Sequence, residues 1–181
     1  IANCLVGSEM CIRDSFTNCS QLYNFCRIVD DIADNNYKNK KLLLKNIYNS
    51  ITNPDSFNSK YISEIKPLIK SNIINKVCLK ELVYGVMLDT KKKINILDKS
   101  ELINYAYYVA GTVGIMMAKI LNAKNKYAYR YAVDLGIAMQ ITNIMRDIIE
   151  DASMDRVYYP KVWIKLTSKK IRLNIETSIK Q

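Results

Sequence analysis

Four oxygen-bearing side chains follow one another at helical spacing within a largely apolar segment. Gln140, Asn143, Asp147 and Asp151 are separated by three, four and four residues, which places them in one line along an α-helix. The surrounding residues 133–149 are apolar almost all round, as in a buried helix. Buried carboxylates need a positive partner, and these oxygens suit Mg²⁺. A solvated acidic stripe on a surface helix is the alternative, which the apolar surroundings disfavour.

A second segment, LYNFCRIVDDIAD at residues 22–34, repeats this arrangement. Its Tyr23, Arg27, Asp30 and Asp34 lie on one helical stripe at spacings of four, three and four, and apolar residues cover the flanks. Seven of the 17 acidic residues fall in two short windows: Asp30, Asp31 and Asp34, then Asp147, Glu150, Asp151 and Asp155. The sequence therefore predicts two acidic lines that face each other and hold divalent metal.

The composition limits the chemistry further. The chain has 181 residues, enough for one domain with one core, and its 27 basic and 17 acidic residues give a net charge of +10. This charge suits an anionic partner, but a general richness in Lys, Asn and Ile explains it equally well. No histidine is present, which excludes Ser–His and Cys–His catalysis and histidine-based zinc sites. The five cysteines show no Cys-x-x-Cys spacing and indicate reduced, mostly buried thiols in an intracellular protein.

The elements that must position these residues are predicted to be helices. Apolar patterns indicate helices at 41–51, at 61–74 with a start or kink at Pro67, and at 76–92. Asp89, near the end of the last, is either a helper of the ligands or a surface acid, and we slightly favour the second reading. No glycine-rich phosphate loop and no alternating strand pattern occurs, so the fold is predicted to be all-α.

A long uncharged run follows a predicted capping box at residues 98–101. Residues 102–118 carry no charge, but their tyrosines and glycines make them too polar for a convincing membrane span, so one buried helix is the better reading. The small residues of this run, Gly111 and Gly114 among them, either allow close helix packing or line a slot for a long apolar ligand. Both readings stay open.

The two ends of the chain fit less well. Residues 1–15 show no clear period and no signal-peptide pattern, and we interpret them as a non-native leader before a partial domain at 16–181. Residues 163–181 are basic and only weakly periodic.

Three segments carry a resemblance to a known family. LYNFCRIVDDIAD, YAYYVAGTVGIMMAKIL and LGIAMQITNIMRDIIEDASMDRVYYP resemble signature segments of the squalene/phytoene synthase family, in register over residues 22–163. The last segment is most similar to bacterial phytoene synthases. The resemblance implies an all-α isoprenoid synthase helical bundle around a central cavity. The family's serine-containing segment before the first motif and its last helices have no counterpart, so the chain resembles an interior fragment, truncated at both ends.

The resemblance also implies roles for individual residues. The metal ligands would be Asp30, Asp34, Asn143, Asp147 and Asp151, and the contacts to diphosphate or its metal and water shell would be Tyr23, Arg27, Gln140, Arg146, Arg156 and Tyr158. Tyr105 would lie near the reacting carbons, while Val109 and Gly114 would line the prenyl channel.

The implied activity is an Mg²⁺-dependent head-to-head condensation of two prenyl diphosphates, with Mn²⁺ as an alternative ion. Geranylgeranyl diphosphate would give phytoene through a cyclopropyl diphosphate, without NADPH. The alternatives are a presqualene, squalene or dehydrosqualene synthase that uses farnesyl diphosphate, and a non-catalytic assembly factor. The second motif, Asp-x-x-x-Asp, disfavours chain-elongating synthases and terpene cyclases. We expect a cytoplasmic protein, peripherally associated with the inner face of the membrane, and no nucleic-acid partner because the positive charge is scattered.

Overall fold

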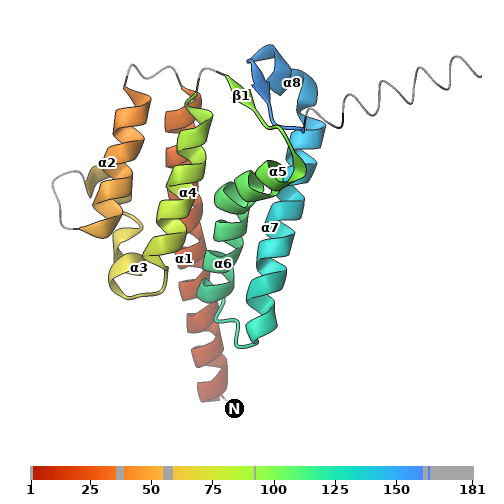
Figure 1. Cartoon of the computed structure of the whole chain (residues 1–181). Coiled ribbons are helices and arrows are strands. Elements are labelled where there is room, and N and C mark those ends of the chain that lie inside the picture. Colours follow the sequence, from red (N-terminus) through yellow and green to blue (C-terminus); the bar gives the residue numbers. More distant parts are fainter. Residues whose placement is uncertain (1, 36–38, 55–58, 92, 161–162, 164–181) are drawn as a thin grey trace, which may run out of the picture.

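The computed structural model describes residues 2–35, 39–54, 59–91, 93–160 and 163, and the described chain is almost entirely helical (Figure 1). The α-helices are α1 Ala2–Asp34, α2 Lys40–Thr52, α3 Lys66–Lys70, α4 Lys76–Asp89, α5 Lys99–Ala106, α6 Thr112–Ile120, α7 Lys126–Arg146 and α8 Ile148–Ser153. A 3₁₀ turn, η1 (Ser59–Ile62), and a π-helical turn, η2 (Tyr107–Gly111), join them. The all-α prediction is confirmed. Helix α1 runs through the stretch in which the sequence shows no clear period, and the segment from residue 164 onward lies outside the described residues.

Two short parallel strands connect distant parts of the chain. β1 (Ile94–Asn95) follows α4 and pairs with β2 (Arg156–Val157), which follows α8, in the register Ile94↔Arg156 and Asn95↔Val157. Each strand has two residues, too few for an alternating pattern to appear in the sequence. The pairing places the segment after α8 beside the loop between α4 and α5.

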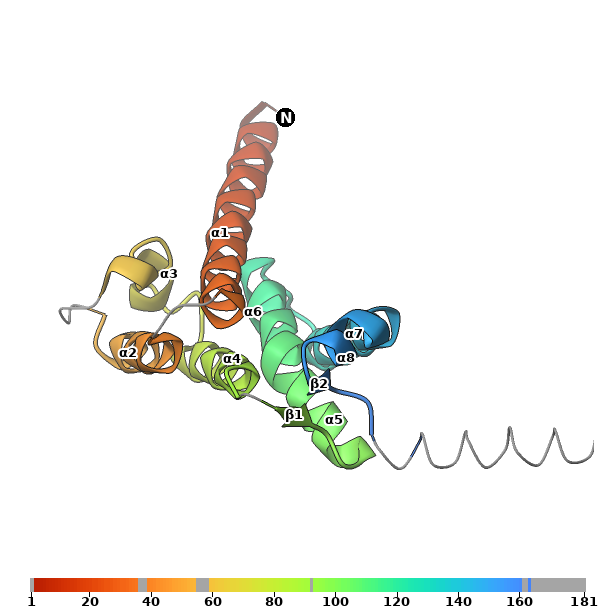
Figure 2. The same cartoon turned by 90° about the horizontal axis from the view of Figure 1, so that it is seen from above.

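The main core surrounds α4, which packs against α1, α2, α6 and η2. In both views α2, α4, α6 and α7 follow one another across the molecule (Figures 1 and 2). On α1 the buried residues Leu22, Phe25, Val29 and Ile32 recur at helical spacing and form an apolar face. This face lies beside the stripe that carries the aspartates. A second, smaller core contains Ile94, Ile96, Leu102, Tyr105, Ile144 and Tyr158.

The uncharged run divides into three elements rather than one helix. The predicted capping box is present at its start, because the Glu101 N–H donates to the Asp98 carboxylate at 2.9 Å. The Glu101 carboxylate accepts from the Leu97 N–H at 2.8 Å. After α5 the backbone widens into η2 before α6 begins. Among the described residues, no helix combines the length and the apolar character needed to cross a membrane.

Glycines bring α6 and η2 against the backbone of α7. A Cβ on Gly136 would lie 2.5 Å from the Ala110 carbonyl oxygen, and a Cβ on Gly114 would collide with the Ala132 carbonyl oxygen. Backbone atoms cannot move aside as a flexible side chain can, so glycine is required for this spacing. The structure therefore supports close helix packing as one use of the small residues.

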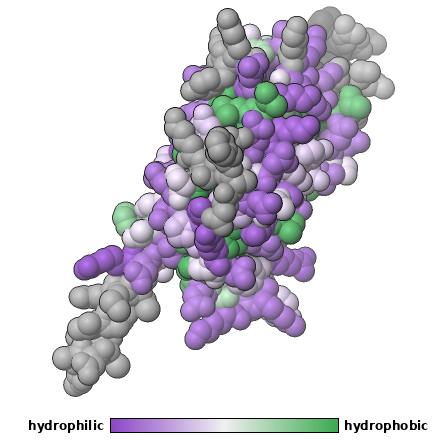
Figure 3. Space-filling model, turned by 90° about the vertical axis from the view of Figure 1, so that its left-hand side faces the viewer, coloured by the Kyte–Doolittle hydropathy of each residue, from purple (hydrophilic) through white to green (hydrophobic). Residues whose placement is uncertain are grey.

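Helix α7 is not buried as its composition predicts. It packs against α5, η2 and α6, but of its residues only Ile144 is fully buried, and Leu135 and Met139 are 62% and 59% exposed. The prediction of a buried helix at residues 133–149 was wrong, because the apolar composition of a helix does not determine how many neighbouring elements pack against it. By contrast, the side formed by α2 and α3 is mostly hydrophilic, with scattered apolar residues (Figure 3).

Candidate active site

Both acidic lines border one pocket of about 240 Å³. We call it the acidic pocket, and its lining comprises Asp30, Asp34, Val86, Asp89, Tyr105, Val109, Gln140, Asn143, Ile144, Asp147, Asp151, Arg156 and Tyr158. The two acidic walls come from α1 and from the α7–α8 segment, and their pocket-lining residues are more than a hundred positions apart in the chain.

The α1 wall concentrates negative charge in a partly buried place. Burial, and then the neighbouring charge of Asp34, raises the pKa of Asp30 to about 6, although Arg27 acts in the opposite direction. Asp34, on the same face, accepts a hydrogen bond from Arg156 Nη1 at 3.0 Å. A carboxylate with a raised pKa gains from any cation placed beside it, because the cation favours its charged form.

The opposite wall keeps its helical register across a break. Helix α7 ends at Arg146, and Asp147 lies between α7 and α8 with φ −99° and ψ 13°. The Asp147 N–H nevertheless donates to Asn143 O, and the Asp151 N–H donates to Asp147 O, both at 2.9 Å. Hydrogen bonds to the fourth preceding residue are therefore present on each side of the break and meet at Asp147, which keeps these side chains on one face as the spacing predicts.

Two arginines form ion pairs with aspartates of the acidic pocket. Arg146 donates to both carboxylate oxygens of Asp147, from Nε at 2.7 Å and from Nη2 at 2.6 Å, and holds the pKa of Asp147 below its usual value. The Arg156 side chain is only 18% exposed, and its charge also acts on Asp151. Burial, the largest effect, raises the pKa of Asp151.

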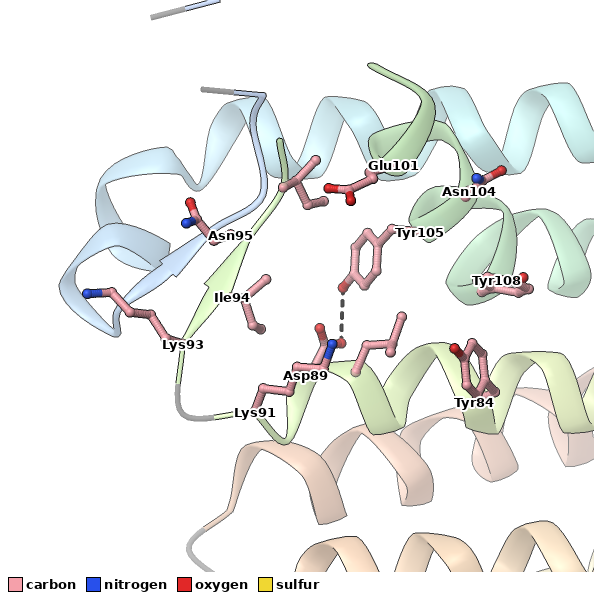
Figure 4. Close-up of a pocket in the computed structure, with 12 residues that line it drawn as sticks. Tyr84, Asp89, Lys91, Lys93, Ile94, Asn95, Glu101, Asn104, Tyr105 and Tyr108 are labelled. Carbon is pink, nitrogen blue, oxygen red and sulfur yellow. Dashed lines mark hydrogen bonds between the residues drawn. The ribbon is translucent and has the colours of Figure 1, made fainter. Parts of the chain in front are cut away.

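Asp89 is not the surface acid that we favoured from the sequence. One carboxyl oxygen accepts a hydrogen bond from the Tyr105 hydroxyl at 3.0 Å (Figure 4). The other oxygen accepts from the Tyr158 hydroxyl at 2.9 Å. Burial raises its pKa to about 7, against the opposing effect of the two hydroxyl donors. A signal was available, since no other charged residue occurs between Glu81 and Asp89 on α4, but the sequence does not show what covers the end of that helix.

Three residues assigned to the substrate by resemblance do not line the acidic pocket. Tyr23 is 64% exposed on α1, and Arg27, one turn further on, pairs with Asp31 at 3.1 Å. Arg146 points its guanidinium at Asp147, as described above. Their contacts with a substrate stay predictions.

An apolar groove of about 670 Å³ adjoins the acidic pocket along α6 and α7. Val109, Gln140 and Asn143 line both spaces, so the polar and apolar parts are continuous. The groove is otherwise lined by Ala110, Val113, Gly114, Met117, Ala118, Leu121, Ala123, Ala132, Leu135, Gly136 and Met139. Val109 and Gly114 therefore border an apolar groove, and some of the small residues that allow close helix packing also line it. That the groove holds a long apolar ligand stays a prediction.

The donor set fits Mg²⁺ held together with a phosphate ligand. The pocket offers five aspartates, of which Asp89 is already engaged by two tyrosine hydroxyls, and the side-chain amides of Gln140 and Asn143. The carboxylate and amide oxygens are hard donors. Among the described side chains, however, no group of three acids or thiols lies close enough to enclose an ion alone. Mg²⁺ commonly uses one or two carboxylates and completes its shell with water and substrate phosphates. The crowded negative charge at Asp30 agrees with such binding.

Comparisons with known proteins match the chain to one family model and to several named relatives. The family model described as squalene/phytoene synthase matches residues 7–171. A phytoene synthase of Pseudescherichia vulneris is 48% identical over 63 residues, which cover 35% of this chain and 20% of the relative. A 15-cis-phytoene synthase of a Paracoccus species is 39% identical over 85 residues, or 46% of this chain and 27% of the relative.

A plant relative gives a similar result. The chloroplastic phytoene synthase of Daucus carota is 42% identical over 94 residues, which cover 48% of this chain and 23% of the relative. Across these three relatives the matched segments span only 20% to 27% of the relative's length. The family match, by contrast, extends over most of the chain and includes both acidic lines. The chain therefore belongs to the squalene/phytoene synthase family.

Proposed function

We propose that the protein catalyses the Mg²⁺-dependent head-to-head condensation of two molecules of geranylgeranyl diphosphate to phytoene. The observation that carries this proposal is the continuity of the acidic pocket with the apolar groove through Val109, Gln140 and Asn143. A prenyl diphosphate has a charged head and a long apolar tail, and these adjoining spaces match its two parts. The names of the relatives support phytoene as the product.

The charged head would be bound at the acidic pocket. Asp30, Asp34, Asn143, Asp147 and Asp151 would hold Mg²⁺, which supplies positive charge between two anionic partners and stabilises departing diphosphate. Arg156, already directed at Asp34, would contribute further positive charge near the leaving group. Arg27 and Arg146 would reach the same shell only by leaving their present aspartate partners.

The apolar groove would protect the reacting carbons. Loss of diphosphate leaves an allylic cation, which alkylates the double bond of the second substrate and, with loss of a proton, gives a cyclopropylcarbinyl diphosphate. A second ionisation, a rearrangement and the loss of another proton give phytoene, so the balance is two diphosphates and two protons released. Walls without water or nucleophiles prevent capture of the cations. Tyr105, at the edge of the acidic pocket, would lie near these carbons.

Peripheral contact with a membrane is part of the same proposal. Leu135 and Met139 are more than half exposed and belong to the wall of the groove. An apolar rim at the mouth of a lipid-binding groove would let a substrate pass from the bilayer into the groove with little exposure to water.

The test of the product is incubation of the full chain with Mg²⁺ and either geranylgeranyl or farnesyl diphosphate, each with and without NADPH, and comparison of the hydrocarbons formed from each substrate. We expect phytoene from geranylgeranyl diphosphate with and without NADPH, detected by chromatography and mass spectrometry. Formation of squalene from farnesyl diphosphate only in the presence of NADPH would contradict phytoene as the product. Formation of dehydrosqualene from farnesyl diphosphate without NADPH would contradict it as well. Binding of prenyl diphosphate without any turnover would favour the non-catalytic alternative.

The test of the site compares matched aspartates. Asp30→Asn and Asp151→Asn should each lower kcat about a hundredfold, the scale expected when one charge-stabilising contact of a transition state is removed. Asp134→Asn makes the same chemical change at an exposed position of α7 outside the acidic pocket and the groove, and should leave kcat within about twofold. Equal losses in all three variants would contradict the assignment of the acidic pocket.

A further inference from the structure

Asp89 joins three elements that are separate in the chain. It is the last residue of α4, and its carboxyl receives the hydroxyls of Tyr105, from α5, and Tyr158, which directly follows β2. The two tyrosine rings stack with centroids 4.9 Å apart and planes inclined by 26°. Both oxygens of one partly buried carboxyl are therefore used to fix two aromatic side chains at the edge of the acidic pocket.

The same cluster leads to Arg156 through a short path. Tyr158 lies two residues beyond Arg156, and the strand between them is bound to β1, where the Ile96 N–H donates to Val157 O at 3.0 Å. Arg156 in turn donates to Asp34 on α1. Movement of Tyr158 would therefore move the backbone that presents Arg156 to the aspartates.

Asp89 and Tyr105 also separate the acidic pocket from a second space. A pocket of about 330 Å³ lies on their other side and is lined by both residues together with Tyr84, Lys91, Lys93 and Tyr108, among others (Figure 4). The hydrogen-bonded pair is thus a wall shared by two pockets. A displaced Tyr105 would connect the reaction space with the lysine-bordered pocket and admit water to it.

Stability alone explains this arrangement poorly. Desolvation of a carboxyl offsets much of what its hydrogen bonds contribute, so a buried carboxyl is a weak device for stabilising a fold. It is an effective device for orientation, because its two oxygens accept from fixed directions and penalise rotation of the donors.

We propose that Asp89 is a positioning residue, whose carboxyl fixes the hydroxyls of Tyr105 and Tyr158 and thereby holds Arg156 over the acidic pocket. This inference rests on the proposed function for the roles of Tyr105 and Arg156. It differs from that function in assigning no contact with substrate to Asp89 itself. Its effect is exerted through the two tyrosines and the strand.

The chain offers a matched control on the same elements. Glu81, also on α4, accepts a hydrogen bond from the Tyr107 hydroxyl of η2 at 3.1 Å. This pair has the same chemistry as Asp89 and its tyrosines, but neither residue lines the acidic pocket, the apolar groove or the pocket of Figure 4. Loss of a tyrosine–carboxylate bond can therefore be separated from loss of positioning.

The experiment compares Asp89→Asn with Glu81→Gln, and Tyr158→Phe with Tyr107→Phe, in the full chain. Isothermal titration with inorganic diphosphate and Mg²⁺ reports the site without catalysis, and steady-state kinetics with geranylgeranyl diphosphate report kcat and KM. We expect Asp89→Asn and Tyr158→Phe to weaken diphosphate binding and lower kcat by about tenfold or more, as when an orienting partner of a functional group is lost. The controls should stay within about twofold. Two types of variant are used so that poor folding of one leaves the other measurable.

The outcomes separate the inference from the proposed function. If the unaltered protein makes phytoene and the two test variants match their controls in binding and kcat, positioning by Asp89 is wrong and the function stands. If diphosphate binding separates test variants from controls but no hydrocarbon forms, the function is wrong and positioning stands. If the unaltered protein does not bind diphosphate with Mg²⁺, both are wrong.

Discussion

Asp30 and Asp89 are two carboxyls whose pKa values are raised by the same cause but whose surroundings differ. Burial is the largest influence on both and raises their pKa values to about 6 and about 7. Asp30 has Asp34 and Asp31 as further negative neighbours, whereas Asp89 receives two hydroxyl hydrogen bonds. Asp30 is therefore short of positive charge and suited to a cation, while Asp89 is satisfied without one.

The raised pKa of Asp89 predicts a dependence of stability on pH. The folded protein keeps a proton on this carboxyl up to about pH 7, whereas the unfolded chain releases it near the ordinary value of 3.8. Between these values the folded state binds more protons, so the free energy of unfolding should fall as pH rises. Urea unfolding of the protein and of Asp89→Asn between pH 4 and pH 8 measures the difference. Parallel curves for the two proteins would contradict the assignment.

At this scale the sequence predicted the carboxylates but not all their partners. A spacing of four places Asp30 with Asp34 and Asn143 with Asp147, because helix geometry is local. The bond from Arg156 to Asp34 spans 122 residues, and no local rule states which helix faces which. For the same reason the sequence could not decide whether Asp89 is a helper of the metal ligands or a surface acid. Its partial burial and its hydrogen bonds from two tyrosine hydroxyls exclude the surface acid.

Among the elements, the contact of α7 with η2 and α6 depends on the absence of two side chains. Gly136 faces the Ala110 carbonyl and Gly114 faces the Ala132 carbonyl, each from the opposite helix. This reciprocal approach sets the distance between the helices and so the width of the apolar groove that they border.

Adding one methyl group at this contact should be costly. Gly136→Ala should lower the free energy of unfolding by about 2 kcal/mol or more, because overpacking against backbone cannot be relieved by a rotamer change. Gly111→Ala is the control, since its Cβ would meet the Tyr107 side chain at 3.0 Å, which can shift, and the cost should stay below about 1 kcal/mol. Chemical denaturation measures both values. Equal stability of the two variants would show that the interface is looser than described.

The sequence identified most elements but not their continuity. The uncharged run was expected as one helix, yet it contains η2, because the widened turn is a response to packing against α4 and α7. Helix α7 was expected to be buried, yet one side is exposed, because periodicity records apolar faces and not the neighbours available to cover them. The start of α5 was predicted correctly, since a capping box acts within four residues.

On the scale of the whole molecule, the volume of the groove bears on the length of the substrate. Phe25 and Met116 are buried in the main core, whereas Met117 belongs to the groove wall. Phe25, Met116 and Met117 are large enough to limit the depth of the groove. Of these three, only Met117 borders the space in which a prenyl tail would lie.

Two adjacent methionines make this testable. Met117→Ala should enlarge the groove and raise the ratio of kcat/KM for geranylgeranyl over farnesyl diphosphate several-fold, because each additional methylene accommodated contributes about 1 kcal/mol or more. Met116→Ala should leave that ratio unchanged and lower the free energy of unfolding by about 2 to 5 kcal/mol. An unchanged ratio in Met117→Ala would place the tail elsewhere.

The pairing of β1 with β2 has a consequence for biosynthesis. As the chain leaves the ribosome, the aspartates of α1 and the end of α4 emerge long before Arg156 and Tyr158. Helices α1, α2 and α4 can already pack, since their contacts need nothing that follows. Asp34 and Asp89 must then remain without their later partners until residues 156–158 dock against β1. The acidic pocket is thus completed late, and a nascent chain stalled before residue 156 would present a folded core with an open, acidic flank.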